Sequence, residues 1–274
     1  MASGASADAA AAEEACVSAL ERWRDGGSEA ASPPFALSPA ERAWCSRTRL
    51  QRYSAARGLD FARASASLRE TLLWRRTAVV RPLACAPCAA DRAAHCFVPV
   101  GLTAEGASVV FICPARAKEP GVEETIAHVV STLEQCFSHP RADGTWIVIL
   151  DFAGFGLTHA MQVRLGAHFA TMFSSHLPET LRFFCLVNTP TIFQMLRSLI
   201  EPFADARTMS KVKSVAGSAA EVEAQLIGFG VPARSARWVR DAGELPPTPG
   251  ALPPLPPGAA ELAPPGSAWA EAES

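Results

Sequence analysis

The stretch Thr145-Trp146-Ile147-Val148-Ile149-Leu150-Asp151 decides the fold, because it places five consecutive apolar residues directly before a carboxylate. An apolar run of this length predicts a strand that is buried on both faces. A glycine-containing turn follows it, and further elements come in the order helix 159–176, strand 181–187, helix 192–200 and strand 211–215. This alternation predicts an α/β sheet with crossover helices.

Regular elements extend outward from this stretch in both directions. Before the central stretch, apolar periodicity predicts strands at 96–100 and 108–113 and a helix at 122–137. After the last predicted strand it predicts one more helix, at 219–227. Closer to the N-terminus, Ser38, Pro39 and Glu41 form a capping-box pattern that starts a helix reaching about residue 56. Asp60 is the expected cap of a second helix, 61–76, so a helical hairpin precedes the sheet.

Composition excludes several classes of protein. The chain has 274 residues, of which 49% are hydrophobic, so it can bury a substantial core. Its net charge is −2 and its pI is about 6.3, which does not favour nucleic acid as a partner. No apolar run approaches the roughly 20 residues of a membrane span, and the Ala-rich start lacks the basic region of a secretory signal. Eight scattered cysteines indicate a reducing compartment.

The two ends of the chain differ in composition from its middle. We predict a mostly disordered Ala-rich start at 1–37, with a short helix at 13–23, and a helical module with its connector at 38–94. A core follows at 95–240, and a disordered Pro-rich tail at 241–274. The tail favours polyproline II conformation. Its Pro253-x-x-Pro256 pattern is a candidate SH3-type ligand, and a plain disordered tail is the favoured interpretation.

Cys85-x-x-Cys88, followed by His95 and Cys96, offers four residues of the types that bind zinc. Adjacent His and Cys residues rarely both turn inward, and no second clean pair occurs. We therefore favour a loop without a metal ion here, and we expect no metal site elsewhere. His128, His168 and His176 fall on predicted helices, where we expect them to face solvent or to pack.

The sequence contains no pattern that supports catalysis. Asp151 ends a buried strand, where open α/β sheets hold ligands, but the glycines at 154 and 156 lack a third partner and no phosphate-binding loop follows. We expect Asp151 to accept hydrogen bonds from the turn that follows it. No Gly-x-Ser-x-Gly elbow occurs, and the histidines are dispersed. We predict no catalytic residues and no enzymatic activity.

The central stretch resembles the lipid-binding core of the CRAL-TRIO family, which includes phosphatidylinositol and phosphatidylcholine transfer proteins. The resemblance rests on five short motifs in the family's order, which are 148–154, 176–181, 186–190, 201–203 and 208–212. The predicted helical hairpin resembles the family's N-terminal module, on the segment 50–60 and the Leu68…Trp74-Arg75 pattern. The chain lacks the family's Gly-Arg-Pro-Val element, where it has Gly-Ala-Ser-Val at 106–109, and it lacks the Gly-Gly of the family's closing element.

The resemblance implies a CRAL-TRIO-like α/β fold, in which an N-terminal helical hairpin precedes a mixed β-sheet flanked by helices that enclose an apolar lipid pocket. It implies a mobile gate helix whose apolar face covers the acyl chains, formed by Ile192, Phe193, Leu196, Leu199, Ile200 and Phe203. It also implies four headgroup-binding residues, Arg57, Glu179, Thr208 and Lys211. Each has a structural alternative, because a charged or hydroxyl side chain at these positions could equally cap a helix, a turn or a strand end.

The function implied by the resemblance is non-catalytic binding of a phospholipid, most closely phosphatidylinositol, and its exchange or presentation at a cytosolic membrane surface. The bound phospholipid is a ligand, and no cofactor is expected. We expect a cytoplasmic monomer that associates peripherally and transiently with membranes. Two alternatives remain: a tocopherol- or retinoid-like ligand in the same pocket, or a degenerate protein-interaction module.

Overall fold

The computed structural model describes the parts of the chain at 2–27, 35–79, 83, 85–91, 94–118, 121–156, 163–189 and 209–265. The chain forms two compact units, each considered separately below. Unit 1 comprises Met1–Thr77 and Met172–Thr180, and unit 2 comprises Ala78–Thr171 and Leu181–Ser274.

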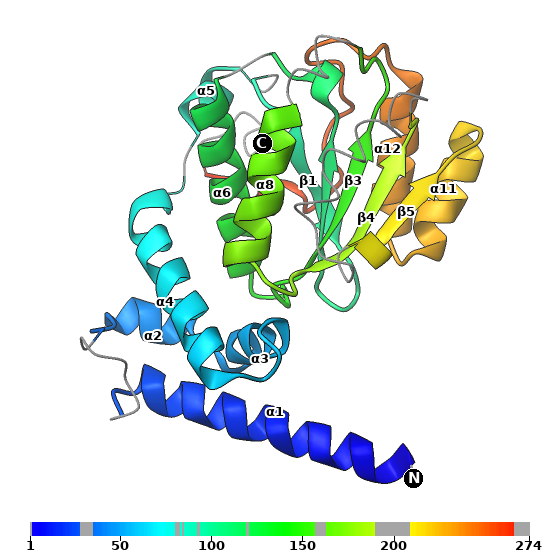
Figure 1. Cartoon of the computed structure of the whole chain (residues 1–274). Helices are drawn as coiled ribbons and strands as arrows, with labels where there is room; N and C mark the ends of the chain where they lie inside the picture. Colours follow the sequence, from blue (N-terminus) through cyan, green and yellow to red (C-terminus); the bar gives the residue numbers. More distant parts are fainter. Residues whose placement is uncertain are drawn as a thin grey trace. The chain divides into compact units, whose positions relative to one another are not determined.

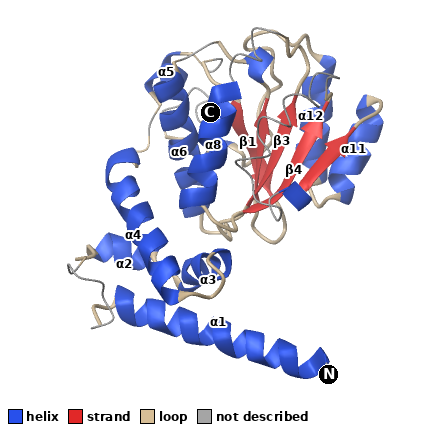
Figure 2. Cartoon of the chain, viewed as in Figure 1, coloured by secondary structure: helices blue, strands red, loops and turns tan. Residues whose placement is uncertain are grey.

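Unit 2 is built on one five-stranded sheet (Figures 1 and 2). The strands follow one another in chain order, and they are β1 Phe97–Leu102, β2 Ser108–Ile112, β3 Trp146–Asp151, β4 Leu181–Val187 and β5 Val212–Val215. β1 and β2 pair antiparallel, whereas β2 to β5 are parallel. The predicted mixed α/β sheet is therefore confirmed, and β3 is its central strand.

The helices of unit 2 lie on both faces of this sheet (Figure 1). One face carries the crossover helices α6, Val122–Ser138, and α8, Val163–His176, which connect parallel strands. The other carries α11, Ala219–Gly228, and α12, Ala233–Glu244. Ser218 and Glu221 form a capping box at the start of α11. The sequence did not predict α12, which packs Trp238 edge-on against Phe111 of β2.

The Pro-rich segment after α12 is part of the core, so the prediction of a disordered tail from 241 is wrong for the described residues up to 265. Leu252, Leu255 and Ala259 are buried in the apolar cluster that includes Phe111 and Trp238. A short 3₁₀ helix, Ala260–Leu262, ends this segment, and Leu262 packs against Leu102 and Cys136. Its apolar residues alternate with prolines, so an extended chain can present them to one surface without intrachain hydrogen bonds.

A single arginine holds this segment in place. Arg116, in the 3₁₀ helix Pro114–Arg116, is completely buried. Its guanidinium donates hydrogen bonds to four backbone carbonyls, those of Ala242 at 2.7 Å, Leu245 at 3.1 Å, Pro246 at 2.9 Å and Ala251. A rigid fork with five N–H donors suits such convergent carbonyls.

The predicted SH3-type ligand lies inside this packed segment. Pro256 is buried, and the indole N–H of Trp238 donates to the carbonyl of Pro254 at 2.7 Å. A peptide-binding domain would have to detach the segment to reach both Pro253 and Pro256.

Unit 1 consists of helices near the N-terminus, the end of α8 from Met172 onward and the turn that follows it. Its helices are α1 Ala2–Arg24, α2 Pro39–Trp44, α3 Arg47–Ala56 and α4 Phe61–Ala78, of which Thr77 is the last residue in this unit. The helix predicted within a disordered start, 13–23, is longer than expected. Its side chains Val17, Leu20 and Trp23 are buried with Leu50 and Tyr53 of α3, and this packing supports an Ala-rich helix.

Capping residues divide the predicted helical hairpin more finely than expected. The predicted capping box at Ser38 and Glu41 is confirmed, but the helix ends at Trp44. Ser46 then caps α3 by accepting the N–H of Arg49, so a single helix to residue 56 was wrong. Asp60 accepts the N–H of Arg63 at 2.9 Å and starts α4 as predicted.

Glu41 links α2 to α4 through Arg76, whose Nε donates to its carboxylate at 2.7 Å. This hydrogen bond is the main reason that the pKa of Glu41 is lowered to about 2. Because the folded pKa lies below the unfolded value, the stabilisation is complete above the unfolded pKa and disappears as the pH falls from about 4.5 to about 2. We expect Glu41→Gln to cost about 1 kcal/mol at pH 7 and almost nothing near pH 2.

Chemical unfolding at a series of pH values, with wild type and Glu41→Gln compared at each pH, measures this effect. Arg76→Gln is the matched partner variant and should remove the same pH-dependent part of the stability. A difference between wild type and Glu41→Gln that stays constant from pH 7 to pH 2 would contradict the assignment.

Candidate functional site

Arg57 follows α3 directly, as the C-cap residue. Its Nη2 donates a hydrogen bond to the hydroxyl of Ser67 on α4 at 2.8 Å, and the side chain is half-buried. The guanidinium is thus held between two helices of unit 1 and has further N–H groups available by its chemistry. A positive charge just beyond a helix C-terminus is also favourable for the helix.

Glu179 lies in the turn Leu177–Thr180, which follows α8 in unit 1. Its φ angle is +56°, in the left-handed region that L-residues with a Cβ rarely adopt. Thr180 stabilises the turn by donating its hydroxyl to the carbonyl of Leu177 at 2.8 Å. The backbone therefore places a glutamate where a glycine would be favoured.

The end of α8 is tied to α3 and α4 within unit 1. The Tyr53 hydroxyl lies 2.9 Å from the carbonyl of His176 and 2.8 Å from the hydroxyl of Thr71. The His176 ring stacks on Trp74 at 4.4 Å between centroids, and burial lowers its pKa. Of the two predicted alternatives for His176, facing solvent or packing, the structure shows packing. Arg57 and Glu179 lie four and three residues beyond Tyr53 and His176, respectively.

Lys211 belongs to unit 2 and comes immediately before β5, where the resemblance placed it. Its carbonyl accepts the backbone N–H of Phe184 on β4 at 3.1 Å, and its side chain is half-buried. The predicted site residue Thr208 lies outside the described residues. The same is true of all six predicted gate residues, Ile192, Phe193, Leu196, Leu199, Ile200 and Phe203.

Asp151 has the structural role predicted for it. Its Oδ1 accepts the backbone N–H of Ala153 at 2.9 Å, which closes the turn after β3. The same oxygen accepts the side-chain amide of Asn188, at the end of β4, at 2.8 Å. The buried carboxylate therefore joins two strand ends through Oδ1.

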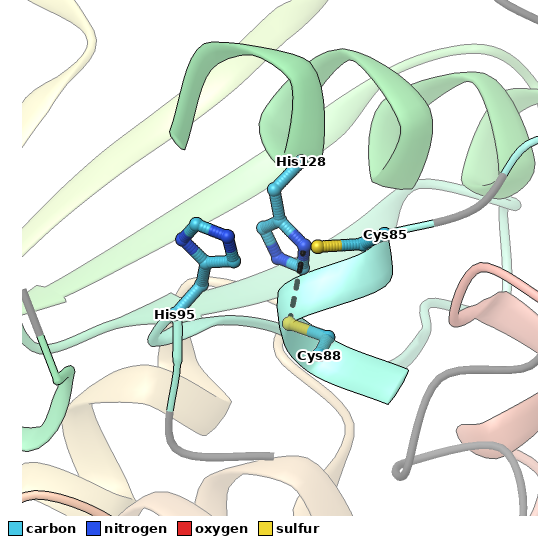
Figure 3. A group of neighbouring side chains, drawn as sticks. All are labelled: Cys85, Cys88, His95 and His128. Atoms are coloured by element: carbon cyan, nitrogen blue, oxygen red, sulfur yellow. Dashed lines mark hydrogen bonds between the residues drawn. The ribbon is translucent and has the colours of Figure 1, made fainter. Parts of the chain in front are cut away.

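Three of the four zinc-ligand candidates are neighbours in the structure. Cys85, Cys88 and His95 come together, and His128 of α6 joins them in place of Cys96 (Figure 3). Cys96 instead lies in the apolar cluster with Val98, because successive residues of an extended chain point in opposite directions. His128, which we expected to face solvent or to pack, is buried and stacks on His95. No zinc-ligand motif in the sequence links His128 to the segment 85–95.

The sheet-containing part of the chain was compared with protein-family models and with solved structures. Residues 93–226 match the family model described as CRAL/TRIO domain. This part of the chain is a CRAL/TRIO domain. The solved structure of Sfh5 is similar, with a TM-score of 0.56 and 15% identity, over 81% of this chain and 88% of that one. A search of curated proteins found no significant match.

The CRAL/TRIO domain supports a lipid-binding or lipid-transfer role, and such domains are in general not enzymes. Glu179 and Lys211 fall within its matched range, whereas Arg57 precedes it. Among the helices that the structure describes, none combines the length and apolar character needed to cross a bilayer.

Proposed function

We propose that this chain binds phosphatidylinositol and exchanges or presents it at cytosolic membrane surfaces without catalysis. The observation that carries the proposal is the CRAL/TRIO domain, matched over residues 93–226. Its charged residues favour an anionic polyol headgroup. Arg57 and Lys211 supply cations for a phosphodiester, and Glu179 supplies an acceptor for inositol hydroxyls.

The backbone at Glu179 is an independent reason to expect a function there. A residue with a Cβ held at φ +56° costs about 1 kcal/mol or more relative to glycine. Glutamate brings no conformational advantage at this position. Its carboxylate is therefore the property of interest, and binding a ligand hydroxyl is the role we assign to it.

The acyl chains supply most of the affinity in this proposal. Burial of each CH₂ contributes about 0.8 kcal/mol, so two chains need an apolar enclosure. We assign the gate of that enclosure to the apolar residues predicted at 192–203, on sequence grounds. Thr208 completes the proposed headgroup set. Transfer then requires the gate to open at a bilayer, which makes the protein a transient peripheral partner of membranes.

Native mass spectrometry of the full chain, followed by lipid extraction and identification, tests the proposal. We expect phosphatidylinositol bound to the wild type after incubation with mixed-lipid vesicles. Glu179→Gly and Lys211→Ala should each reduce the bound fraction by about tenfold or more, as expected when a charge-assisted hydrogen bond is lost.

Glu179→Gly separates binding from folding, because glycine accepts the left-handed backbone. Its thermal unfolding should stay close to that of wild type. Leu59→Gly is the matched control, since Leu59 also has a positive φ of 63° and is not in the proposed headgroup set. Arg141→Ala, at an exposed residue, controls for loss of a cation.

Three results would overturn the proposal. A bound lipid without phosphate, such as a tocopherol- or retinoid-like molecule, would replace the headgroup assignment. Phosphatidylinositol retained equally by Glu179→Gly, Lys211→Ala and the controls would remove these residues from the site. No lipid after incubation with vesicles would favour a protein-interaction module.

A further inference from the structure

Four buried side chains from three separate segments converge next to β1 in unit 2. Cys85 caps α5, Ala86–Ala90, and Cys88 lies within it. His95 lies two residues before β1, and His128 lies on α6. Their ligand atoms, two sulfurs and two ring nitrogens, all lie within 4.8 Å of one another. Figure 3 shows the two thiols and the two rings directed toward a common point.

His95 has no conventional explanation as a packed core residue. It is 2% exposed, and neither of its ring nitrogens has a hydrogen-bond partner among the described residues. Leaving a buried polar group unpaired costs about 1–3 kcal/mol, and such groups are rare. The imidazole stacks on His128 at 4.4 Å between centroids, which places its unpaired nitrogens beside the other three side chains.

His128 is held in the tautomer that a metal ligand needs. Its Nε2 lies 3.1 Å from the carbonyl of Phe97, which can only accept, so Nε2 carries the proton. Its Nδ1 is then bare, and it lies 3.5 Å from the sulfur of Cys88. A ring N–H donated to a backbone carbonyl is the usual way in which proteins orient a metal-binding histidine.

We propose that Cys85, Cys88, His95 and His128 bind one zinc ion. Two thiolates and two imidazoles are a common tetrahedral zinc set. Zn–S bonds of about 2.3 Å and Zn–N bonds of about 2.0 Å give ligand–ligand edges of about 3.3–3.8 Å. The 3.5 Å distance between the Cys88 sulfur and Nδ1 of His128 lies in this range. The ligand atoms as a set lie within 4.8 Å of one another, so they need to approach by at most about 1 Å to bind one ion.

Charge favours the ion in this buried position. Two thiolates neutralise the charge of Zn²⁺, so the complete site carries no net charge, and the desolvation penalty of burying isolated ions is avoided. All four coordination positions come from the protein, which makes this a structural rather than a catalytic site.

A redox-active cysteine pair fits the same residues less well. Reactive cysteines are partly exposed, whereas Cys88 is completely buried and Cys85 nearly so. A Cys85–Cys88 disulfide would also leave both nitrogens of His95 unpaired. Both cysteines are free thiols in the structure.

The ion would fasten the connector between α4 and β1 to the sheet and to α6. α5 has only five residues, far fewer than an isolated helix needs to be stable in water. Its own apolar contacts are few, since Cys85 and Cys88 form a small separate cluster with Ala94. Metal binding would therefore supply folding free energy to this connector.

Elemental analysis of the full chain, purified under reducing conditions without added metal, tests the proposal. We expect about one zinc per chain in wild type, and less than about a tenth of that in Cys88→Ser and in His128→Gln. Cys96→Ala is the matched control, because Cys96 neighbours His95 but faces the apolar cluster. It should retain the zinc.

Measurements on wild type keep the test decisive if the variants fail to fold. Chelator-stripped protein should take up Co²⁺ with the strong visible absorption of a tetrahedral site and with sulfur-to-metal charge transfer. Thermal unfolding should occur at lower temperature after stripping and recover on adding Zn²⁺ alone.

The proposal would be overturned by any of three results. In the first, reduced wild type takes up neither Zn²⁺ nor Co²⁺. In the second, the purified protein contains a Cys85–Cys88 disulfide or an iron centre. In the third, Cys96→Ala loses zinc and His128→Gln keeps it.

Discussion

A chain that ends at Glu244 is expected to lose the cooperative unfolding transition of its sheet unit. Truncation removes Leu252, Leu255 and Leu262, which are buried, and it uncovers Trp238. Each buried leucine contributes about 2–3 kcal/mol, so the loss is about 6–9 kcal/mol, comparable to the total stability of a domain. The shortened chain should melt far below wild type or aggregate during expression.

The matched control ends at Pro265, which keeps every residue that makes these contacts. Thermal melts followed by circular dichroism, together with limited proteolysis, compare the two chains. A chain ending at Glu244 that unfolds at the same temperature as the control would show that the segment 245–265 adds nothing to the core.

Arg116→Met is expected to destabilise the protein by about 3 kcal/mol or more, because buried carbonyls lose a charged donor. Methionine fills a similar volume but donates nothing, so the four carbonyls lose the N–H groups of Arg116. The carbonyls of Ala242 and Pro246 keep a backbone N–H, from Leu245 and Thr248. The segment after α12 would then keep its apolar contacts, the hydrogen bond from Trp238, and those that join Gly250 to the Arg116 carbonyl and Gln135 to the Glu261 carbonyl. Denaturant unfolding measures the change in free energy.

Two further substitutions show whether geometry or charge is responsible. Arg116→Lys keeps the charge but lacks the planar fork, so we expect an intermediate loss. Arg237→Met, at a side chain 63% exposed on α12, should change stability by less than about 0.5 kcal/mol. Arg116→Met as stable as Arg237→Met would contradict the role assigned to Arg116.

Local sequence was sufficient for the central sheet. The apolar run at Trp146–Leu150 and the strand at Leu181–Val187 were predicted within one residue of their observed ends. Strands buried on both faces need continuous apolar residues, so their signal is present in the sequence itself. The caps at Ser38 and Asp60 were predicted correctly, because a cap acts on a backbone N–H only a few residues away. The cap at Ser46 was missed.

The headgroup candidates rest on a different argument, namely the resemblance to a family, and they stay predictions. The structure describes Arg57, Glu179 and Lys211 at the end of a helix, in a turn and before a strand, as the motifs implied. Nothing in the sequence indicated the left-handed backbone at Glu179. A φ angle follows from how the turn after α8 is packed, and glutamate itself does not favour that conformation.

Local sequence patterns determined the strands of the sheet, the crossover helices α6 and α8, and the chemical types of the candidate site residues. Only the tertiary structure decided which distant residues meet. Proline-rich composition predicts an extended chain, but whether that chain is solvated or packed depends on a complementary surface, here Trp238 and Arg116. Likewise, His128 reaches Cys85, Cys88 and His95 because α6 packs against β1, and that contact has no counterpart in linear spacing.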